Sequence, residues 1–264
     1  FAAIITDHNF NIIEKINLRC KLKEYIVPSL GALKTTGVRP AELDKPELTE
    51  YNLSLKLTDN FRKWSPCIFM GYNTINFDEK FLRHTFYRNL LPVYQTQNFG
   101  NGRLDILKAV NALHALQPGI IKLGIKEDGK EDRRLETIAP LNGFQNHLAH
   151  DALGDVYATV FLAKKIATNA PDFWSNYLKC LDKRSSSQIY LGAKCVTVVQ
   201  GTKSKLLFPI RPSKDKRGYL CAKFDTKEKL QTFGSLNSQI GDFLDPQLYE
   251  TPVLNAAYFV SRNL

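Results

Sequence analysis

The chain has 264 residues, a formal net charge of +10 and 44% hydrophobic residues, which fits one large globular domain or two small ones. No apolar run is long enough to cross a bilayer, and the first residues lack a signal-peptide pattern. The five scattered cysteines form no Cys-x-x-Cys pair, so we expect a protein of the reducing cytoplasm with no membrane partner.

Strands and helices alternate through the first part of the chain. Residues 1–22 alternate apolar and polar side chains around an Asp-His-Asn turn, which predicts a hairpin. The pattern then predicts a loop through Pro28 and Gly31, helix over 42–63, a short buried strand at 67–73, and helices over 77–89, 103–116 and 134–141. This order favours an α/β layer fold.

A further helix begins at His150-Asp-Ala-Leu-Gly-Asp155 and is expected to end near residue 167. Its buried stripe is predicted from the three-and-four spacing of apolar residues, and Asp155 falls on the same side. The stripe consists of Ala152, Val156, Thr159, Val160 and Ala163. Burying a carboxylate on an apolar face costs free energy unless a cation or strong hydrogen-bond donors contact it. The sequence therefore favours a hard metal ion bound at Asp155.

Asp78 has a similar position on the helix over 77–89. Acids on separate helices can converge on two metal ions that hold a phosphodiester, and His150 could take the proton from the attacking water. Each residue also has a plainer explanation. An acid in a helix's first turns often interacts with the helix dipole, and a lone histidine is more often structural.

The sequence pattern changes after Pro171. It predicts a short helix over 172–180, followed by strands at 194–200, 205–210 and 219–224. This predicts a small β barrel or sheet. Between Lys183 and Leu230 twelve Lys and Arg residues stand against three acids, so this segment carries nearly the whole positive excess. A nucleic-acid partner is the first hypothesis, and a merely well-solvated surface is the alternative.

Several motifs together resemble the bacterial exodeoxyribonuclease I family, in the DEDDh branch of 3′→5′ exonucleases. In chain order they are Gly71-Tyr-Asn-Thr-Ile-Asn-Phe-Asp78-Glu, Arg103-Leu-Asp105, Arg134-Leu-Glu136 and His150-Asp-Ala-Leu-Gly-Asp155-Val-Tyr-Ala-Thr159. The resemblance implies an α/β, RNase H-like exonuclease domain over residues 1–170, lacking its first strand. It also implies an incomplete, basic, SH3-like nucleic-acid-binding domain over residues 171–264.

The resemblance also implies roles for individual residues. Asp78 and Asp155 would be metal-linked acids, with two Mg²⁺ ions as cofactors and Mn²⁺ as a substitute, and His150 would be the general base. The substrate-binding residues would be Arg134 at the cleaved nucleotide and Arg83, Tyr94 and Lys183 along the single strand. The implied activity is release of 5′-mononucleotides from single-stranded DNA by a monomer, with a single-stranded DNA-binding protein as a further partner.

One motif of that family is missing. Its Asp-x-Glu should lie on the strand before the opening segment, and no Asp-x-Glu occurs in the sequence. We therefore expect an interior fragment of an exonuclease, with an opened sheet, no C-terminal helical domain and no activity on its own. The alternatives are a DEDDh exonuclease acting on RNA or in proofreading, and a non-catalytic single-strand binder.

Overall fold

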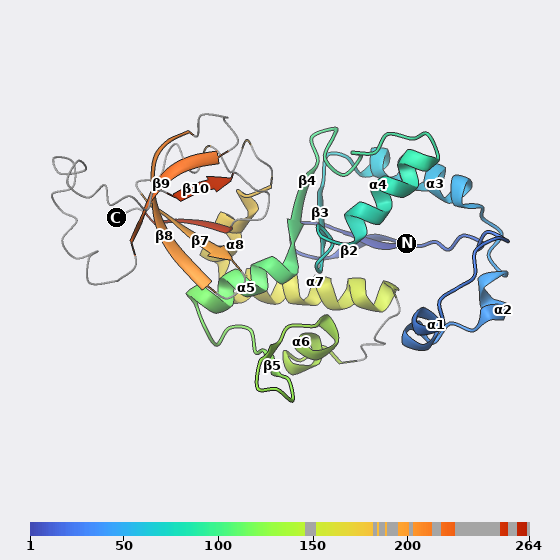
Figure 1. The fold of residues 1–264 in the computed structure, drawn as a ribbon, viewed down its shortest axis with the longest axis horizontal. Helices are drawn as coiled ribbons and strands as arrows, with labels where there is room; N and C mark the ends of the chain where they lie inside the picture. The colour runs from blue at the N-terminus through green and yellow to red at the C-terminus, as the bar shows by residue number, and fades with distance from the viewer. Residues whose placement is uncertain are drawn as a thin grey trace. The chain divides into compact units, whose positions relative to one another are not determined.

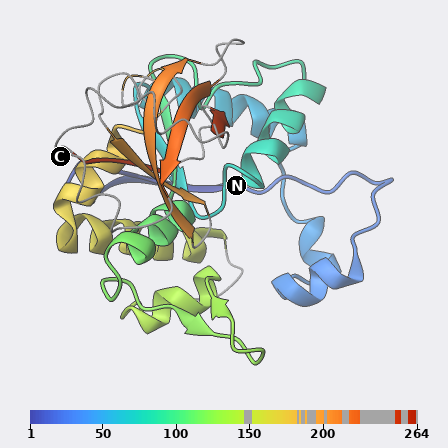
Figure 2. The same ribbon diagram turned by 60° about the vertical axis from the view of Figure 1, so that its left-hand side comes forward.

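A computed structural model describes residues 1–145, 152–181, 184, 188, 195–200, 203–212, 218–224, 249–252 and 258–262. The chain divides into two compact units. The first comprises Phe1–Leu107 and Lys122–Lys165, and the second Lys108–Ile121 and Ile166–Leu264. Figures 1 and 2 show the elements of both units from two directions. None of the helices in the described ranges is long and apolar enough to span a membrane.

The first unit opens with the predicted hairpin. Strands β1 (Ala2–Thr6) and β2 (Ile12–Asn17) pair antiparallel. Asp7 closes the turn between them, because its Oδ1 accepts the backbone N–H groups of Asn9 and Asn11, both at 2.8 Å. An aspartate that bonds the backbone two residues on is a usual turn former, so the Asp-His-Asn signal was correct.

Three helices follow, α1 (Leu30–Thr36), α2 (Pro40–Leu43) and α3 (Glu50–Trp64). The prediction of a loop through Gly31 was wrong over α1. Gly37 ends α1 with φ +67°, so the Thr-Thr-Gly run taken for a loop includes the C-terminal cap of a short helix. The Thr49 hydroxyl begins α3 by accepting the Asn52 backbone N–H at 3.1 Å.

Strands β3 (Ile68–Gly71) and β4 (Gly102–Asp105) pair in parallel, and α4 (Asp78–Arg88) connects them (Figure 1). A single helix over residues 103–116 was therefore wrong at its start, because α5 begins only at Ile106 and ends at Leu116. Apolar residues lie on both sides of this junction, with Leu104 before it and Ile106 and Leu107 after it, so hydrophobic spacing alone does not reveal the change. Within the described residues β1–β2 and β3–β4 are separate sheets, which fits the opened sheet that we expected.

The core of the first unit lies under α3 and α4. Leu53, Leu57 and Phe61 of α3 are buried against Phe86 of α4, and Phe61 is only 1% exposed. The Phe61 ring centroid lies 4.9 Å from that of Phe69 and 6.1 Å from that of Phe86, both edge to face. These rings pin α4 against α3, which fixes the direction in which α4 presents its N-terminal turn.

The remaining elements of this unit are β5 (Gly124–Ile125), β6 (Glu131–Asp132), α6 (Leu135–Leu141) and most of α7 (Ala152–Asn169). The stripe predicted on α7 is rotated from the observed one. Thr159 and Ala163 of the predicted stripe are buried, but Ala152 is exposed, and the fully buried residues are Ala158, Leu162 and Ile166. Asp155 is half-buried and lies in line with Thr159, Leu162 and Ile166, so it falls on the buried side of α7 as predicted.

The second unit contains α8 (Pro171–Leu178) and one antiparallel sheet in the order β10-β9-β8-β7-β11, drawn in orange and red in Figure 2. The three predicted strands are β7 (Cys195–Gln200), β8 (Lys203–Pro212) and β9 (Gly218–Phe224). The pattern missed β10 (Tyr249–Pro252) and β11 (Tyr258–Arg262). The SH3-like assignment and the domain boundary at residue 170 stay predictions.

Glu50 at the start of α3 joins this helix to the end of α4. Its two carboxylate oxygens accept the Nε and Nη2 of Arg88 at 2.8 and 2.9 Å, and Asn89 donates at 2.9 Å. These bonds, led by the one from Arg88, lower the pKa of Glu50 from 4.5 to about 2. A lowered carboxyl pKa stabilises the fold above pH 4.5, and this contribution is lost as the pH falls towards 2.

We predict that Glu50→Gln lowers the free energy of unfolding at pH 7 by about 1 kcal/mol, because an ion pair near the surface contributes little more than this. The deficit should shrink as the pH falls below 4.5, as measured by urea denaturation at several pH values. Glu47→Gln serves as the control, because Glu47 is exposed and forms no ion pair among the described residues. A deficit independent of pH would contradict the prediction.

Candidate active site

The site is built around Asp105, the last residue of β4, whose side chain is completely buried. Its carboxylate accepts the backbone N–H groups of Asn73 at 2.8 Å and Ile75 at 3.3 Å, both in the loop after β3. It also accepts the N–H of Leu107 at 3.1 Å in the first turn of α5. These donors offset the cost of burying a negative charge, and they fix the loop that leads to Asp78.

The same loop has a backbone that only certain residues tolerate. A Cβ atom on Gly71 would lie 2.0 Å from Cγ2 of Thr74, so any other residue there would displace the loop. Asn73 adopts a left-handed backbone with φ +61°, which asparagine accepts more readily than most residues. The Glu79 N–H then bonds the Thr74 carbonyl at 2.9 Å, which sets the start of α4.

Asp78 stands in the first turn of α4 and remains exposed to solvent. Partial desolvation of its carboxyl raises its pKa, and the negative charges of Asp105, Glu79 and Asp155 raise it further. Asp155 lies in the first turn of α7, so the fold brings the two predicted acids from separate helices into electrostatic range. Carboxylates that repel one another in this way favour a cation between them.

The donor chemistry of Asp78 and Asp155 suits a hard divalent ion, since both offer carboxylate oxygens. They are too few by themselves. Within the described ranges, no three His, Cys, Asp or Glu side chains lie close enough together to hold a metal ion. Asp105 is occupied by backbone donors. His150 lies in the stretch 146–151, outside the described residues, so its predicted role as a base stays a prediction.

Glu79, next to Asp78 in sequence, points the other way. Its Oε2 is buried and accepts Arg103 at 3.1 Å, Thr96 at 3.0 Å and Arg83 at 3.5 Å. Desolvation lowers the pKa of Arg103, and the charge of Glu79 opposes this shift. This network ties α4 to β4 and to the segment after Tyr94. Sequence reasoning missed Glu79, although its spacing with Phe86 places both on the buried side of α4.

Arg83 and Tyr94, both predicted to contact a single strand, meet in the structure. The Arg83 guanidinium carbon lies 5.2 Å from the centroid of the Tyr94 ring, which is a cation–π contact. The Tyr94 ring is 52% exposed, and Arg83 keeps part of its guanidinium in solvent. A cation beside an exposed aromatic ring can contact both the phosphate and the base of a nucleotide.

Arg134 is held by acids on both sides. Its Nε and Nη2 bond the Asp132 carboxylate at 2.7–3.1 Å, and its Nη1 lies 3.1 Å from Glu136. The hydrogen bonds from Arg134 lower the pKa of Asp132, and Asp132 in turn raises that of Arg134. The structure therefore orients the guanidinium while leaving its side chain 63% exposed. Lys183, the last predicted contact, lies outside the described residues.

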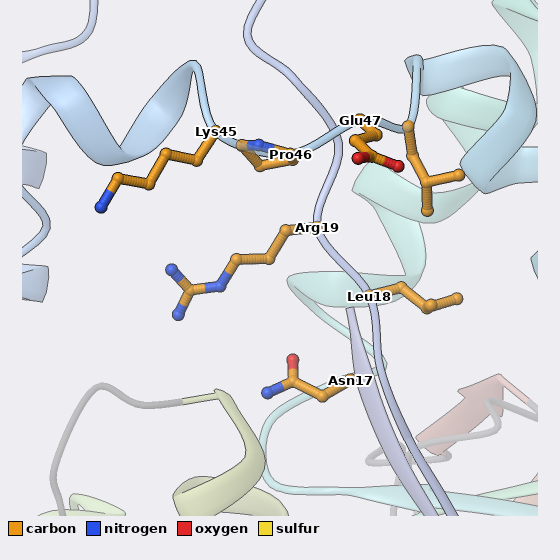
Figure 3. Close-up of a pocket in the computed structure, with 7 residues that line it drawn as sticks. Asn17, Leu18, Arg19, Lys45, Pro46 and Glu47 are labelled. Carbon is orange, nitrogen blue, oxygen red and sulfur yellow. The ribbon is translucent and has the colours of Figure 1, made fainter.

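A separate open depression of about 460 Å³ lies away from these groups (Figure 3). It is formed by the end of β2 and the segment after α2, where Arg19 and Lys45 extend their side chains. None of the candidate site residues lines it. We assign it no role in the chemistry of Asp78 and Asp155.

The buried network around Glu79 yields a stability prediction. Arg103→Met should lower the free energy of unfolding by about 3 kcal/mol, because it leaves the buried Glu79 carboxylate without its buried cationic partner. Arg83→Met is the matched control and should cost about 1 kcal/mol or less, since Arg83 is more exposed and lies farther from Glu79. Equal losses for the two variants in urea denaturation would contradict this ranking.

The chain is similar to known exonucleases in both sequence and structure. The RNase_T exonuclease family model matches residues 1–163. The exodeoxyribonuclease I of Haemophilus influenzae is 35% identical over 191 residues, covering 72% of this chain and 40% of that protein. The Escherichia coli exodeoxyribonuclease I is 36% identical over 173 residues, covering 65% of this chain and 36% of that protein. The chain thus spans about 40% of the length of these curated relatives.

A solved structure of E. coli exonuclease I in complex with a dT13 oligonucleotide matches 99% of this chain and 61% of that chain, with a TM-score of 0.79 and 25% identity. The structure titled "ExoI/SSB-Ct complex" matches 98% of this chain and 60% of that chain, with a TM-score of 0.76 and 25% identity. These likenesses support the predicted RNase H-like α/β fold, and the resemblance inferred from the motifs is confirmed. The chain belongs to the RNase_T exonuclease family.

Proposed function

We propose that this chain forms the exonuclease part of an enzyme that removes 5′-mononucleotides from the 3′ end of single-stranded DNA with the help of Mg²⁺. The observation that carries the proposal is the match of residues 1–163 to the exonuclease family, with Asp78 and Asp155 in the first turns of α4 and α7. Acids that converge from separate helices are part of what a phosphodiesterase needs to gather divalent ions at one point.

Each residue of the site has a specific task in this proposal. Asp78 and Asp155 hold the metal ions, and Asp105 keeps Asp78 in place through the loop after β3. When bound, the ions would activate a water molecule and neutralise charge on the phosphodiester. His150 takes the proton from the attacking water. The guanidinium of Arg134, oriented by Asp132, contacts the phosphate of the terminal nucleotide.

The choice of a single strand rests on the surface beside the site. The Arg83–Tyr94 pair offers a charge and an exposed ring, and Lys183 begins a segment with a large excess of basic residues. Such surfaces bind single strands through phosphates and stacked bases, with affinity that falls as salt rises. A relative's solved complex contains dT13, which supports DNA as the polymer.

A protein partner, an assembly state and a substitute metal ion belong to the same proposal. A structure of a relative is titled "ExoI/SSB-Ct complex", so we propose a single-stranded DNA-binding protein as a partner of this protein as well. The protein acts as a monomer, with Mn²⁺ able to replace Mg²⁺. Experiments should use the product of the complete coding sequence, because the chain spans about 40% of the length of its curated relatives.

We predict that Asp155→Ala abolishes turnover while leaving oligonucleotide binding nearly intact. Loss of a group that merely supports a metal ligand costs 10–100-fold, so loss of a ligand should cost more than about 100-fold. The measurement is release of mononucleotides from 3′-labelled oligo(dT) with Mg²⁺. Asp172→Ala is the control, because Asp172 also lies in the first turn of a helix, α8. Unchanged turnover in the Asp155 variant would contradict the assignment.

His150→Ala should lower the rate by about 10²–10⁴-fold, the usual contribution of a general base, with little effect on metal affinity. The rate should be measured at saturating Mg²⁺, and the metal affinity by calorimetry in the absence of DNA. A large loss of metal affinity would instead make His150 a ligand or a structural residue.

A non-catalytic single-strand binder is the second candidate, and the missing Asp-x-Glu is the observation that favours it. Side-by-side digestion of DNA and RNA oligonucleotides separates the possibilities. We expect Mg²⁺-dependent loss of 3′ nucleotides from DNA. Binding without digestion would support the binder, and preferential digestion of RNA would favour an RNA exonuclease.

A further inference from the structure

Four exposed side chains form a patch on the N-terminal half of α4 that no part of the proposed mechanism uses. They are Phe77, Lys80, Phe81 and His84, which we call the α4 patch. Phe77 and Phe81 are 58% and 61% exposed, although burial of aromatic rings is a main driving force of folding. Two large exposed rings on one helix face therefore indicate a binding surface.

The two rings are in contact. Their centroids lie 4.8 Å apart, with 53° between the ring planes. This contact gives the pair a common apolar surface while much of each ring still meets solvent. A planar guest such as a nucleobase could stack on that surface, because stacking requires only a π face and tolerates any base.

The charges around the rings match the same kind of guest. Lys80 and His84 flank the rings, and neither side chain forms an ion pair or hydrogen bond in the part of the chain that the structure describes. A basic side chain without an acidic partner beside aromatic rings is typical of surfaces that bind the phosphates and bases of single strands.

The position of the patch links it to the site. Successive residues of an α-helix are about 100° apart, so the faces of α4 can be ordered around its axis. Leu82, Phe86 and Glu79 occupy the packed side. Among residues 77–84, the order from Asp78 around the opposite side is Phe81, Phe77, His84, Lys80 and then Arg83, and the exposed Tyr87 of the next turn lies beside Lys80. The α4 patch thus fills the exposed arc between the proposed metal ligand and the Arg83–Tyr94 pair.

We propose that the α4 patch is a stacking and phosphate-binding subsite for the single-stranded substrate, in which Phe77 and Phe81 take a nucleobase and Lys80 and His84 face the adjoining phosphates. This inference rests on the proposed function and adds a surface to it. A strand that contacts both Arg83 and Asp78 would cross this arc. The subsite sets affinity and position along the strand, while the reaction remains at Asp78 and Asp155.

The test is binding of fluorescently labelled oligo(dT) to the full-length protein in EDTA, so that no digestion occurs. The double variant Phe77→Leu/Phe81→Leu should weaken binding about tenfold, in line with base–aromatic stacking. Tyr51→Leu removes another exposed aromatic ring, on α3, and should leave affinity unchanged. Lys80→Gln/His84→Gln should make the dependence of affinity on salt less steep.

Abasic oligonucleotides provide a second measurement. An abasic residue at one or two positions near the 3′ end should weaken binding to the original protein, and the Phe77→Leu/Phe81→Leu variant should not sense this loss. Retention of the abasic penalty together with unchanged affinity for oligo(dT) would overturn the subsite. A fall of several degrees in the melting temperature of this variant would also overturn it, because the rings would then pack against another part of the protein.

Failure of the proposed function would look different. If the original protein bound no oligonucleotide at all, both proposals would fall together. If it bound and digested DNA while the patch variants behaved as the original, only the subsite would be wrong.

Discussion

The buried carboxylate of Asp105 is the interaction on which the site depends. A charge removed from water is costly, and here three backbone N–H groups from two different segments offset that cost. Those segments are the loop that leads into α4 and the first turn of α5. The same charge helps to raise the pKa of Asp78. One residue that contacts no substrate in our proposal therefore controls both the position and the electrostatics of a proposed metal ligand.

The neighbours Asp78 and Glu79 show how one helix serves two purposes. Glu79 is buried among Arg103, Thr96 and Arg83, so it locks α4 to β4. Asp78 comes one residue before Glu79, about 100° around the helix axis, and stays open to solvent. The aromatic core at Phe61 and Phe86 holds the other end of the same helix. The orientation of the site is thus set by buried contacts on the opposite side of α4.

Much of the fold was predictable because local signals were strong. The turn at Asp7, the helix after Phe77 and the strands after residue 194 follow from spacing and turn residues. The β4 strand was missed because it has only four residues and its Leu104 fits the three-residue spacing that Leu107 of α5 continues. Asp78 and Asp155 are far apart in sequence. Residue spacing could therefore suggest that they belong to one site, but it could not establish that the fold brings them together. The burial of Asp105 could not be predicted from the residues around it, since aspartate ordinarily lies at protein surfaces.

The loop between β3 and α4 has a consequence for how this chain can change over evolution. Gly71 leaves room for the Thr74 side chain at one end, the bond from the Glu79 N–H to the Thr74 carbonyl fixes the other end, and Asp105 holds the middle. Residues of this loop whose side chains point outward can be substituted without breaking these contacts. An insertion or deletion of even one residue between Asn73 and Glu79 would break at least one of these contacts and would move Asp78 relative to Asp105. The length of this segment should therefore be far more constant among homologues than its composition.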